Sequence, residues 1–261
     1  MTQPALRPLT LGEILDVSFG LYRHRAAQLL GVALVCTGIP VVLNVYLTAS
    51  GGMLLNLSLA AVYLVLSLVL NSLATASTVF IVSESYLGRG LSAGRALERA
   101  TPYIGRLLML SLLTGLLVGI GFLLLLVPGI ILLAGLILGP PVLVLEGSAA
   151  ATDAMGRSWA LSRGSRGKIL GLLITMALLV YIPVIALGTI AGLVFGVSGV
   201  VPSPADPSAP ALAILIASVG GVVQILLYPM VYCALTVLYY DLRVRKEGFD
   251  LEVLASALQT A

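Results

Sequence analysis

The chain has 261 residues, of which 59% are hydrophobic and 10% charged, and its mean hydropathy is +1.12. Soluble domains carry roughly 25% charged residues, so this composition excludes both a water-soluble globular domain and a disordered chain. A formal net charge of +3 gives no support for a nucleic-acid partner. The sequence therefore predicts an integral membrane protein whose main partner is the lipid bilayer.

The charged residues divide the chain into three apolar blocks. All fourteen Lys and Arg residues lie in four short segments, and every acidic residue except Asp206 lies in or directly beside them. The blocks between these segments, roughly 26–83, 107–145 and 169–240, are each long enough for two spans of about 20 residues. Each block therefore predicts a helical hairpin, which gives about six transmembrane helices.

Breaker residues mark the expected turns in chain order. The first hairpin is expected to turn at 49–52, the second at Pro128-Gly129 and the third through 201–210. The middle hairpin is shorter than its neighbours, so we expect it to be tilted or partly re-entrant. Because basic residues are retained on the cytoplasmic side, both termini and the charged loops are expected in the cytoplasm.

The charged segments also resemble one another in register. At one constant offset, Glu84, Arg95 and Arg106 fall on Glu146, Arg157 and Lys168. This predicts a single membrane domain, 1–261, with a pseudo-threefold internal repeat whose units cover roughly 8–83, 88–145 and 148–240. Each unit would join a short interfacial helix to a hairpin, in an all-α polytopic bundle. A further C-terminal interfacial helix is expected over 249–259.

An acidic residue ends each helix that returns to the charged side: Glu84, Glu146 and Asp241. An acid at a helix C-terminus opposes the helix dipole and needs compensation. One interpretation is an ion pair with an arginine of an interfacial helix, namely Arg95, Arg157 or Arg163. The other is a ring of lipid-headgroup or cation sites at the inner leaflet, where anionic lipid gathers.

Two spans carry polar faces without any ionisable residue. Asn71, Thr75 and Thr78 share one side of the second span, with Ser67 above them. On the sixth span the same spacing joins four residues: Gln224, Tyr228, Tyr232 and Thr236. These faces are either interhelical hydrogen-bond seams or the lining of a small cavity for a lipid or neutral solute.

Most catalytic chemistry lacks the residues that it needs. The one histidine, His24, lies in a basic stretch at the expected interface, and no span contains an Asp or Glu near its centre. Zinc-protease and phosphate-loop motifs are absent. We therefore expect no enzyme activity, no catalytic residues, no metal and no cofactor.

Several stretches resemble the membrane domain of the glycerophosphoryl diester phosphodiesterase family. The resemblance rests on four stretches of sequence: RPLTLGEILD at 7–16, PPVLVLE at 140–146, RSWALSRG at 157–164 and YYDLRVRKEGFDL at 239–251. The resemblance implies a bacterial plasma-membrane protein of about six helices, here without the catalytic barrel of the fused members. It offers only scaffold candidates: Glu146, Arg157, Trp159, Arg163, Asp241, Arg243 and Arg245.

The leading functional hypothesis from the sequence is a non-enzymatic scaffold. It would bind anionic inner-leaflet lipid or a protein partner through its basic cytoplasmic face, where most of the charge lies. The alternative is a permease, or a transporter of a lipid or small solute, that uses the polar faces around Asn71 and Gln224. A continuous polar cavity between the second and sixth spans would favour transport, and a dry seam would reject it.

Overall fold

The computed structural model describes residues 7–197 and 209–248, and this part of the chain is helical throughout apart from its turns and loops. The helices are α1 (Leu11–His24), α2 (Ala26–Ala49), α3 (Leu57–Tyr86), α4 (Ala93–Ala100), η1 (Thr101–Tyr103), α5 (Ile104–Leu124), α6 (Leu126–Leu136), α7 (Gly139–Leu145), α8 (Ala151–Ser162), α9 (Arg166–Val197) and α10 (Ala209–Glu247). The all-α class predicted from composition is confirmed.

Six helical segments are long and apolar enough to cross a membrane. They are Ala26–Ala49, Leu57–Tyr86, Ala93–Leu124, Leu126–Leu145, Arg166–Ile190 and Ala213–Glu247. Two come from each predicted hairpin, so the count of six candidate spans is confirmed. The protein is a polytopic helical membrane bundle.

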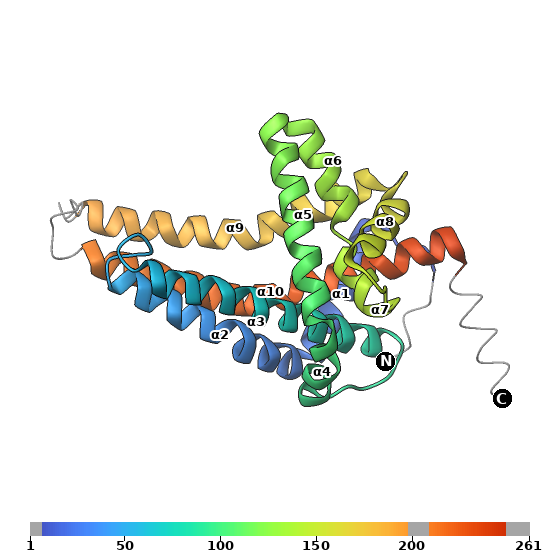
Figure 1. The fold of residues 1–261 in the computed structure, drawn as a ribbon, viewed down its shortest axis with the longest axis horizontal. Helices are drawn as coiled ribbons and strands as arrows, with labels where there is room; N and C mark the ends of the chain where they lie inside the picture. Colours follow the sequence, from blue (N-terminus) through green and yellow to red (C-terminus); the bar gives the residue numbers. More distant parts are fainter. Residues whose placement is uncertain (1–6, 198–208, 249–261) are drawn as a thin grey trace.

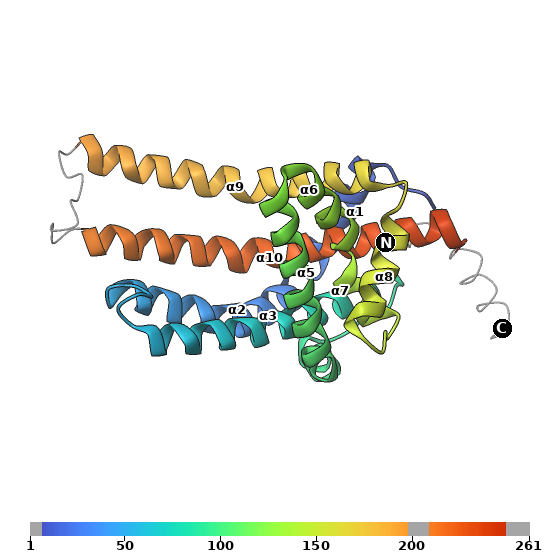
Figure 2. The same ribbon diagram turned by 45° about the horizontal axis from the view of Figure 1, so that its top comes forward.

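The long helices α2, α3, α9 and α10 lie along a common axis (Figures 1 and 2). The short helices α1, α4, α7 and α8 gather around the half of α10 that ends at Glu247. Helix α2 packs against both α3 and α10. Glu84, Glu146 and Asp241 all lie where the short helices gather, and we call this the charged end. The α2–α3 turn lies at the opposite end of the long helices (Figure 1).

The first hairpin turns where the sequence predicted. Gly51 and Gly52 adopt φ values of 99° and 89°, a backbone region that glycine enters without steric penalty. The side-chain amide of Asn56 donates to the carbonyl oxygens of Ser50 and Gly52, at 3.0 and 3.2 Å. The turn at 49–52 is therefore confirmed, with Asn56 holding it closed.

The middle hairpin departs from the predicted turn. Helix α5 ends at Leu124 and α6 starts at Leu126, so the turn is at extended Leu125 and not at Pro128-Gly129. Pro128 fits inside the first turn of α6 because the amides there need no helical partner. A tilt or partial re-entry was predicted for this hairpin, and it runs across the direction of the long helices in both ribbon views (Figures 1 and 2).

Close packing at glycine joins α5 to α6. A Cβ atom at Gly121 would lie 3.0 Å from the Gly129 Cα atom, and one at Gly129 would lie 2.8 Å from the Phe122 backbone nitrogen. The two backbones are therefore too close for side chains at these positions, as small residues allow in membrane helix pairs. This contact fixes the hairpin as one unit.

A short helix precedes each hairpin in the chain: α1, α4 and α8. Helix α1 starts with a capping box, in which the Thr10 N–H donates to Glu13 at 2.7 Å and the Glu13 N–H donates to the Thr10 hydroxyl at 3.3 Å. The backbone bond from Thr10 and the neighbouring Arg7 guanidinium lower the pKa of Glu13 to about 2. The middle hairpin differs in direction from the other two although this order of elements repeats.

Two predictions lie outside the described residues. The C-terminal interfacial helix was predicted over 249–259, beyond the last described residue. Most of the predicted third turn, 201–210, falls between α9 and α10 where only the last two positions are described.

Candidate functional site

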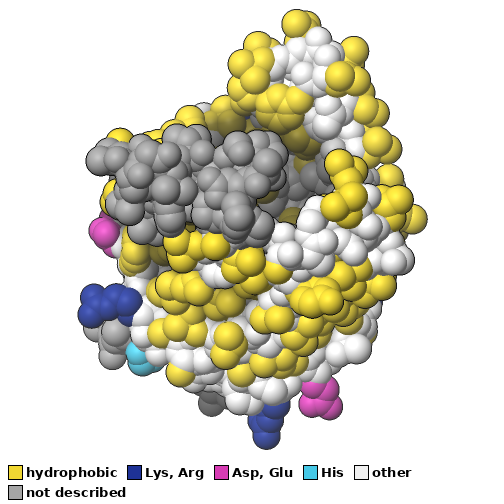
Figure 3. Space-filling view, turned by 90° about the vertical axis from the view of Figure 1, so that its left-hand side faces the viewer, with side chains coloured by type: hydrophobic (Ala, Val, Ile, Leu, Met, Phe, Trp, Pro, Cys, Tyr) yellow, Lys and Arg dark blue, Asp and Glu magenta, His cyan; other side chains and the backbone are white. Residues whose placement is uncertain are grey.

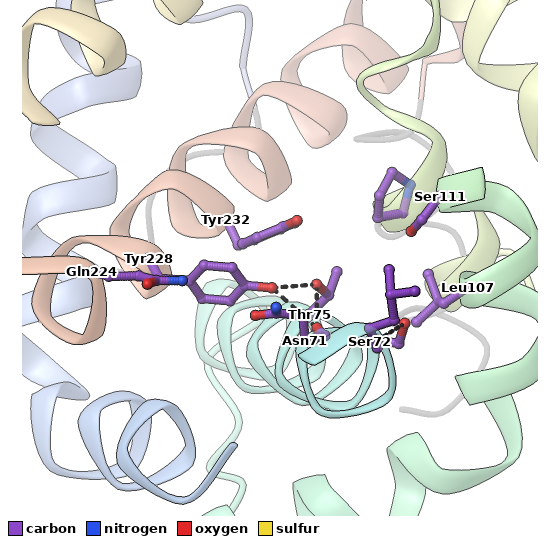
Figure 4. Close-up of a pocket in the computed structure, with 10 residues that line it drawn as sticks. Asn71, Ser72, Thr75, Leu107, Ser111, Gln224, Tyr228 and Tyr232 are labelled. Atoms are coloured by element: carbon purple, nitrogen blue, oxygen red, sulfur yellow. Dashed lines mark hydrogen bonds between the residues drawn. The ribbon is translucent and has the colours of Figure 1, made fainter. Parts of the chain in front are cut away.

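Two adjoining polar cavities lie along the contact between α3 and α10, with volumes of about 260 and 230 Å³. The first is lined by Leu68, Asn71, Ser72, Thr75, Leu107, Ser111, Pro140, Gln224, Tyr228 and Tyr232 (Figure 4). The second is lined by Pro40, Val41, Asn44, Tyr63, Ser67, Asn71, Ala217, Gly220, Gly221 and Gln224. Five helices therefore line one site within the bundle, and four of them, α2, α3, α5 and α10, contribute polar side chains.

Asn71 and Gln224 line both cavities and so mark the point where they meet. Asn71 lies midway along α3, far from both helix ends. Its Oδ1 atom is shielded from solvent and accepts no hydrogen bond from the described residues. A buried amide oxygen without a donor is unfavourable, and more so in hydrocarbon than in water.

Tyr228 connects α10 to α3 beside this junction. Its hydroxyl lies 2.7 Å from the Thr75 hydroxyl and donates to the backbone carbonyl oxygen of Asn71 at 3.1 Å (Figure 4). The Tyr232 ring packs against the Tyr228 ring, with 4.9 Å between their centroids. The two tyrosines form a polar, partly aromatic wall in the first cavity.

The lining contains hydroxyl, amide and aromatic groups but no Asp, Glu, Lys, Arg or His. Such a surface offers hydrogen-bond donors and acceptors without a formal charge. It suits an uncharged polar guest, because an ion would have to leave water with no opposite charge to meet. Within the described residues, no group of three or more His, Cys, Asp or Glu gathers that could hold a metal ion.

Only some residues of the two polar faces predicted from the sequence line the cavities. Asn71, Thr75, Gln224, Tyr228 and Tyr232 line them, whereas Thr78 and Thr236 are buried elsewhere in the helix packing. Sequence reasoning missed lining residues from α2, α5 and α7, such as Asn44, Ser111 and Pro140. Ser111 has one polar neighbour in the apolar run of α5, Thr114, and two residues carried too little periodic signal.

At the charged end, Asp241 is 1% exposed and forms the centre of a buried ionic cluster. It accepts from the Lys168 ammonium at 2.5 Å, from the Arg245 guanidinium at 3.1 Å and from the Leu9 N–H at 2.7 Å. Lys168 and Arg245 also donate to the Leu9 carbonyl oxygen, each at 2.6 Å. This cluster ties the segment before α1 to α9 and α10.

Asp241 was predicted to end the last helix, and the structure corrects this. Helix α10 continues to Glu247, so Asp241 lies inside it and bonds to Arg245 one turn later. The apolar run ends at the carboxylate, but the backbone continues because the cations around Asp241 neutralise it.

Glu146 pairs with Arg157 of α8 at 2.9 Å, and Arg157 also reaches Glu247 at 2.6 Å. Glu146 further accepts from the buried Tyr239 hydroxyl at 2.9 Å, and Glu247 pairs with Arg243 at 3.1 Å. The hydrogen bond to Glu146, and then that to Glu247, raise the pKa of Arg157 above its usual value. The pair fixes α8 to the end of α7 and to α10.

The third acid, Glu84, pairs with Arg89 and Arg99, each at 3.1 Å. The predicted partner Arg95 forms no ion pair within the described chain, and the same is true of Arg163. Arg99 lies one helical turn beyond Arg95 on the same face of α4, so the position of α4 along its axis relative to Glu84 selects Arg99. The Arg163 carbonyl oxygen instead accepts from Lys246.

Trp159, another scaffold candidate, docks α8 onto α6. Its ring covers Gly135, where a Cβ atom would lie only 2.3 Å from the ring. The guanidinium of Arg166, which lies on α9, is 4.2 Å from the ring centroid. The Ser158 hydroxyl donates to the Gly135 carbonyl oxygen at 2.8 Å. These contacts make Trp159 a packing residue between three helices.

A family profile described as "Uncharacterised protein family (UPF0259)" matches residues 49–197, more than half of the chain. The chain belongs to the UPF0259 family. A UPF0259 membrane protein of Pectobacterium carotovorum subsp. carotovorum (strain PC1) is 38% identical over 95 residues. This match covers 36% of the chain and 37% of the relative's length. No solved structure matches this UPF0259 protein.

These comparisons correct the family expectation. The resemblance to the membrane domain of the glycerophosphoryl diester phosphodiesterase family was wrong, because both the profile and the curated relative are UPF0259 and neither points to that domain. Basic and aromatic residues are enriched wherever apolar helices meet a membrane surface, so they do not identify one family. Together with the six apolar helices, the family makes this chain a multi-pass bacterial membrane protein.

Proposed function

We propose that this UPF0259 protein is a non-enzymatic carrier or permease that binds a small uncharged polar molecule between α3 and α10. The observation that carries the proposal is the meeting of two polar cavities at Asn71 and Gln224, with the Asn71 Oδ1 atom shielded and unbonded. A guest with hydroxyl or amide groups would supply the missing donor. Each cavity is smaller than the ~300 Å³ at which drug-sized sites begin, so the guest is a small solute or a small lipid headgroup.

The scaffold hypothesis has less support from the charged end. Arg157, Lys168 and Arg245 form ion pairs with carboxylates of the protein itself, and the Arg166 guanidinium lies against the Trp159 ring. Cations that are neutralised within the protein attract anionic lipid or an acidic partner weakly. Arg23, Arg95 and Arg163 are exposed and have no ion pair within the described residues, so they are the cations most able to contact lipid headgroups if the charged end faces the cytoplasm as the positive-inside rule predicts.

Solute flux through liposomes tests the carrier proposal. Liposomes containing the protein are mixed with hyperosmotic glycerol or urea, and the rate of reswelling is followed by light scattering. We expect wild-type protein to speed reswelling and the Asn71→Leu/Gln224→Leu variant to return the rate to that of protein-free liposomes. Thr236→Val is the matched control, because the Thr236 hydroxyl bonds within α10 and does not line the cavities. Wild-type rates equal to the protein-free rates for both solutes would contradict a permease.

Stability separates a guest cavity from a structural hydrogen-bond seam. Asn71→Leu removes an unbonded buried oxygen, so we expect it to raise the free energy of unfolding by about 1 kcal/mol. Thr75→Val removes the bond to Tyr228, so we expect a loss of about 0.6 kcal/mol, typical of such bonds in membranes. Unfolding in mixed micelles measures both. If Asn71→Leu lowers stability as Thr75→Val does, Asn71 serves the packing of the helices and not a guest.

A further inference from the structure

The tip of the α5–α6 hairpin differs in residue composition from the α2–α3 hairpin turn. No side chain between Thr114 and Glu146 is polar, and the five tip residues Leu123–Val127 are between 65% and 86% exposed. The α2–α3 turn, by contrast, holds Ser50, two glycines and Asn56. A turn that reaches water is expected to carry polar residues, so the composition of this tip indicates hydrocarbon around it.

The direction of the hairpin gives the second observation. Figure 1 shows α5 and α6 crossing the long helices, and Figure 3 shows their tip projecting beyond the rest of the surface, covered with hydrophobic side chains. If α2, α3, α9 and α10 follow the membrane normal, the hairpin lies largely in the membrane plane. It would not carry its tip to the far surface.

Depth follows from the contacts at the base of the hairpin. Leu107 and Ser111 of α5 line the first cavity together with Tyr232 of α10. Tyr232 precedes Asp241 of the charged end by nine residues on α10, or about 13 Å at 1.5 Å per residue. The hairpin therefore leaves the bundle within the leaflet nearer the charged end, since the hydrocarbon core is about 30 Å thick.

The backbone of the tip is adapted to an apolar medium. Leu125 alone separates the two helices, its N–H donates to the Gly121 carbonyl oxygen at 3.1 Å, and its own carbonyl oxygen accepts from the Gly129 N–H at 3.3 Å. Pro128 has no N–H that would need a partner. A turn of this kind exposes few unbonded polar groups to lipid, where each is unfavourable.

We propose that the α5–α6 hairpin enters the leaflet at the charged end and turns back inside it, so that its tip contacts acyl chains without crossing the membrane. Helix α6, with 11 residues, is about 16 Å long, which is shorter than the ~30 Å hydrocarbon core. The partner of this surface is the acyl-chain region of one leaflet. The proposal is independent of whether the cavities carry a solute.

Cysteine accessibility in intact and permeabilised cells tests the proposal. Val127→Cys, Ser50→Cys and Glu98→Cys are placed singly in a Cys36→Ala/Cys233→Ala background and treated with a membrane-impermeant maleimide. Ser50 reports the α2–α3 turn, and Glu98, an exposed residue on α4, reports the charged end. We expect these two to label from opposite sides. Whichever side of the membrane the maleimide reaches, we expect Val127→Cys to label about tenfold less than the Ser50→Cys or Glu98→Cys thiol on that side, because a thiol in hydrocarbon does not ionise.

Labelling of Val127→Cys together with Ser50→Cys would show a hairpin that crosses the membrane and would overturn the proposal. Labelling together with Glu98→Cys would place the tip in water at the charged end and would also overturn it. Reaction of Val127→Cys in denaturing detergent confirms that the thiol is present in the tested protein. Leu124→Cys, on the other side of the turn, must give the same result if the proposal holds.

Discussion

Replacing Asp241 by Asn is expected to lower the free energy of unfolding by about 3 kcal/mol, the lower end of the range for breaking a buried ion pair. The carboxylate is buried, and its loss of charge leaves Lys168 without its counter-ion. We place the value at the lower end because the Arg245 side chain is 40% exposed, so that solvent screens its charge. Unfolding in mixed micelles measures the change.

A second readout separates this local cluster from a general loss of stability. The Leu9 N–H donates to Asp241, so we expect the amides of residues 9–12 to exchange faster with deuterium in Asp241→Asn. Glu98→Gln is the matched control, because Glu98 is exposed and has no ion pair within the described residues. It should change stability by less than about 0.5 kcal/mol. An Asp241→Asn protein with wild-type stability and exchange would contradict the role given to this cluster.

Replacing Gly135 by Val is expected to expel the Trp159 ring and to destabilise the protein by about 1–3 kcal/mol, the usual effect of overpacking. A Cβ atom there would lie 2.3 and 2.4 Å from two ring carbons, and the indole is too rigid to bend away. The ring would also leave the Arg166 guanidinium. Trp159 is the one tryptophan of the chain, so a red shift of tryptophan emission reports its displacement directly.

Gly156→Ala on α8, the helix that carries Trp159, is the control for Gly135→Val. A Cβ atom at Gly156 meets nothing within 4 Å, so alanine should leave the emission unchanged and stabilise α8 by up to about 1 kcal/mol. The packing assigned to Trp159 is wrong if Gly135→Val keeps the wild-type emission maximum and the wild-type stability.

The helices that can cross a membrane were predictable because hydropathy and charge act locally. Long uncharged blocks must lie in hydrocarbon, and the glycines at 51 and 52 mark a turn whatever surrounds them. The second turn was misplaced at Pro128-Gly129 because a proline is equally acceptable in the first turn of a helix. Choosing between these positions requires the contact of Gly121 with Gly129, which periodicity does not reveal.

The candidate site was predictable on two helices and unpredictable beyond them. Spacing placed Asn71 with Thr75, and Gln224 with Tyr228, because residues four apart share a helix face. That Ser111 and Pro140 complete the first cavity depends on α5 crossing the bundle, which is set by long-range packing. The choice of Arg99 over Arg95 for Glu84 likewise depends on where α4 lies along its axis relative to α3, and both arginines fit the sequence pattern equally.

An experimental density map of the protein in a lipid bilayer tests the central claim most directly, at the junction of the two cavities. We predict ordered density for a guest or for water between Asn71 and Gln224, with a donor within hydrogen-bonding distance of the Asn71 Oδ1 atom. A closed seam, in which the Asn71 and Gln224 side chains bond directly to each other and leave no cavity, would contradict it.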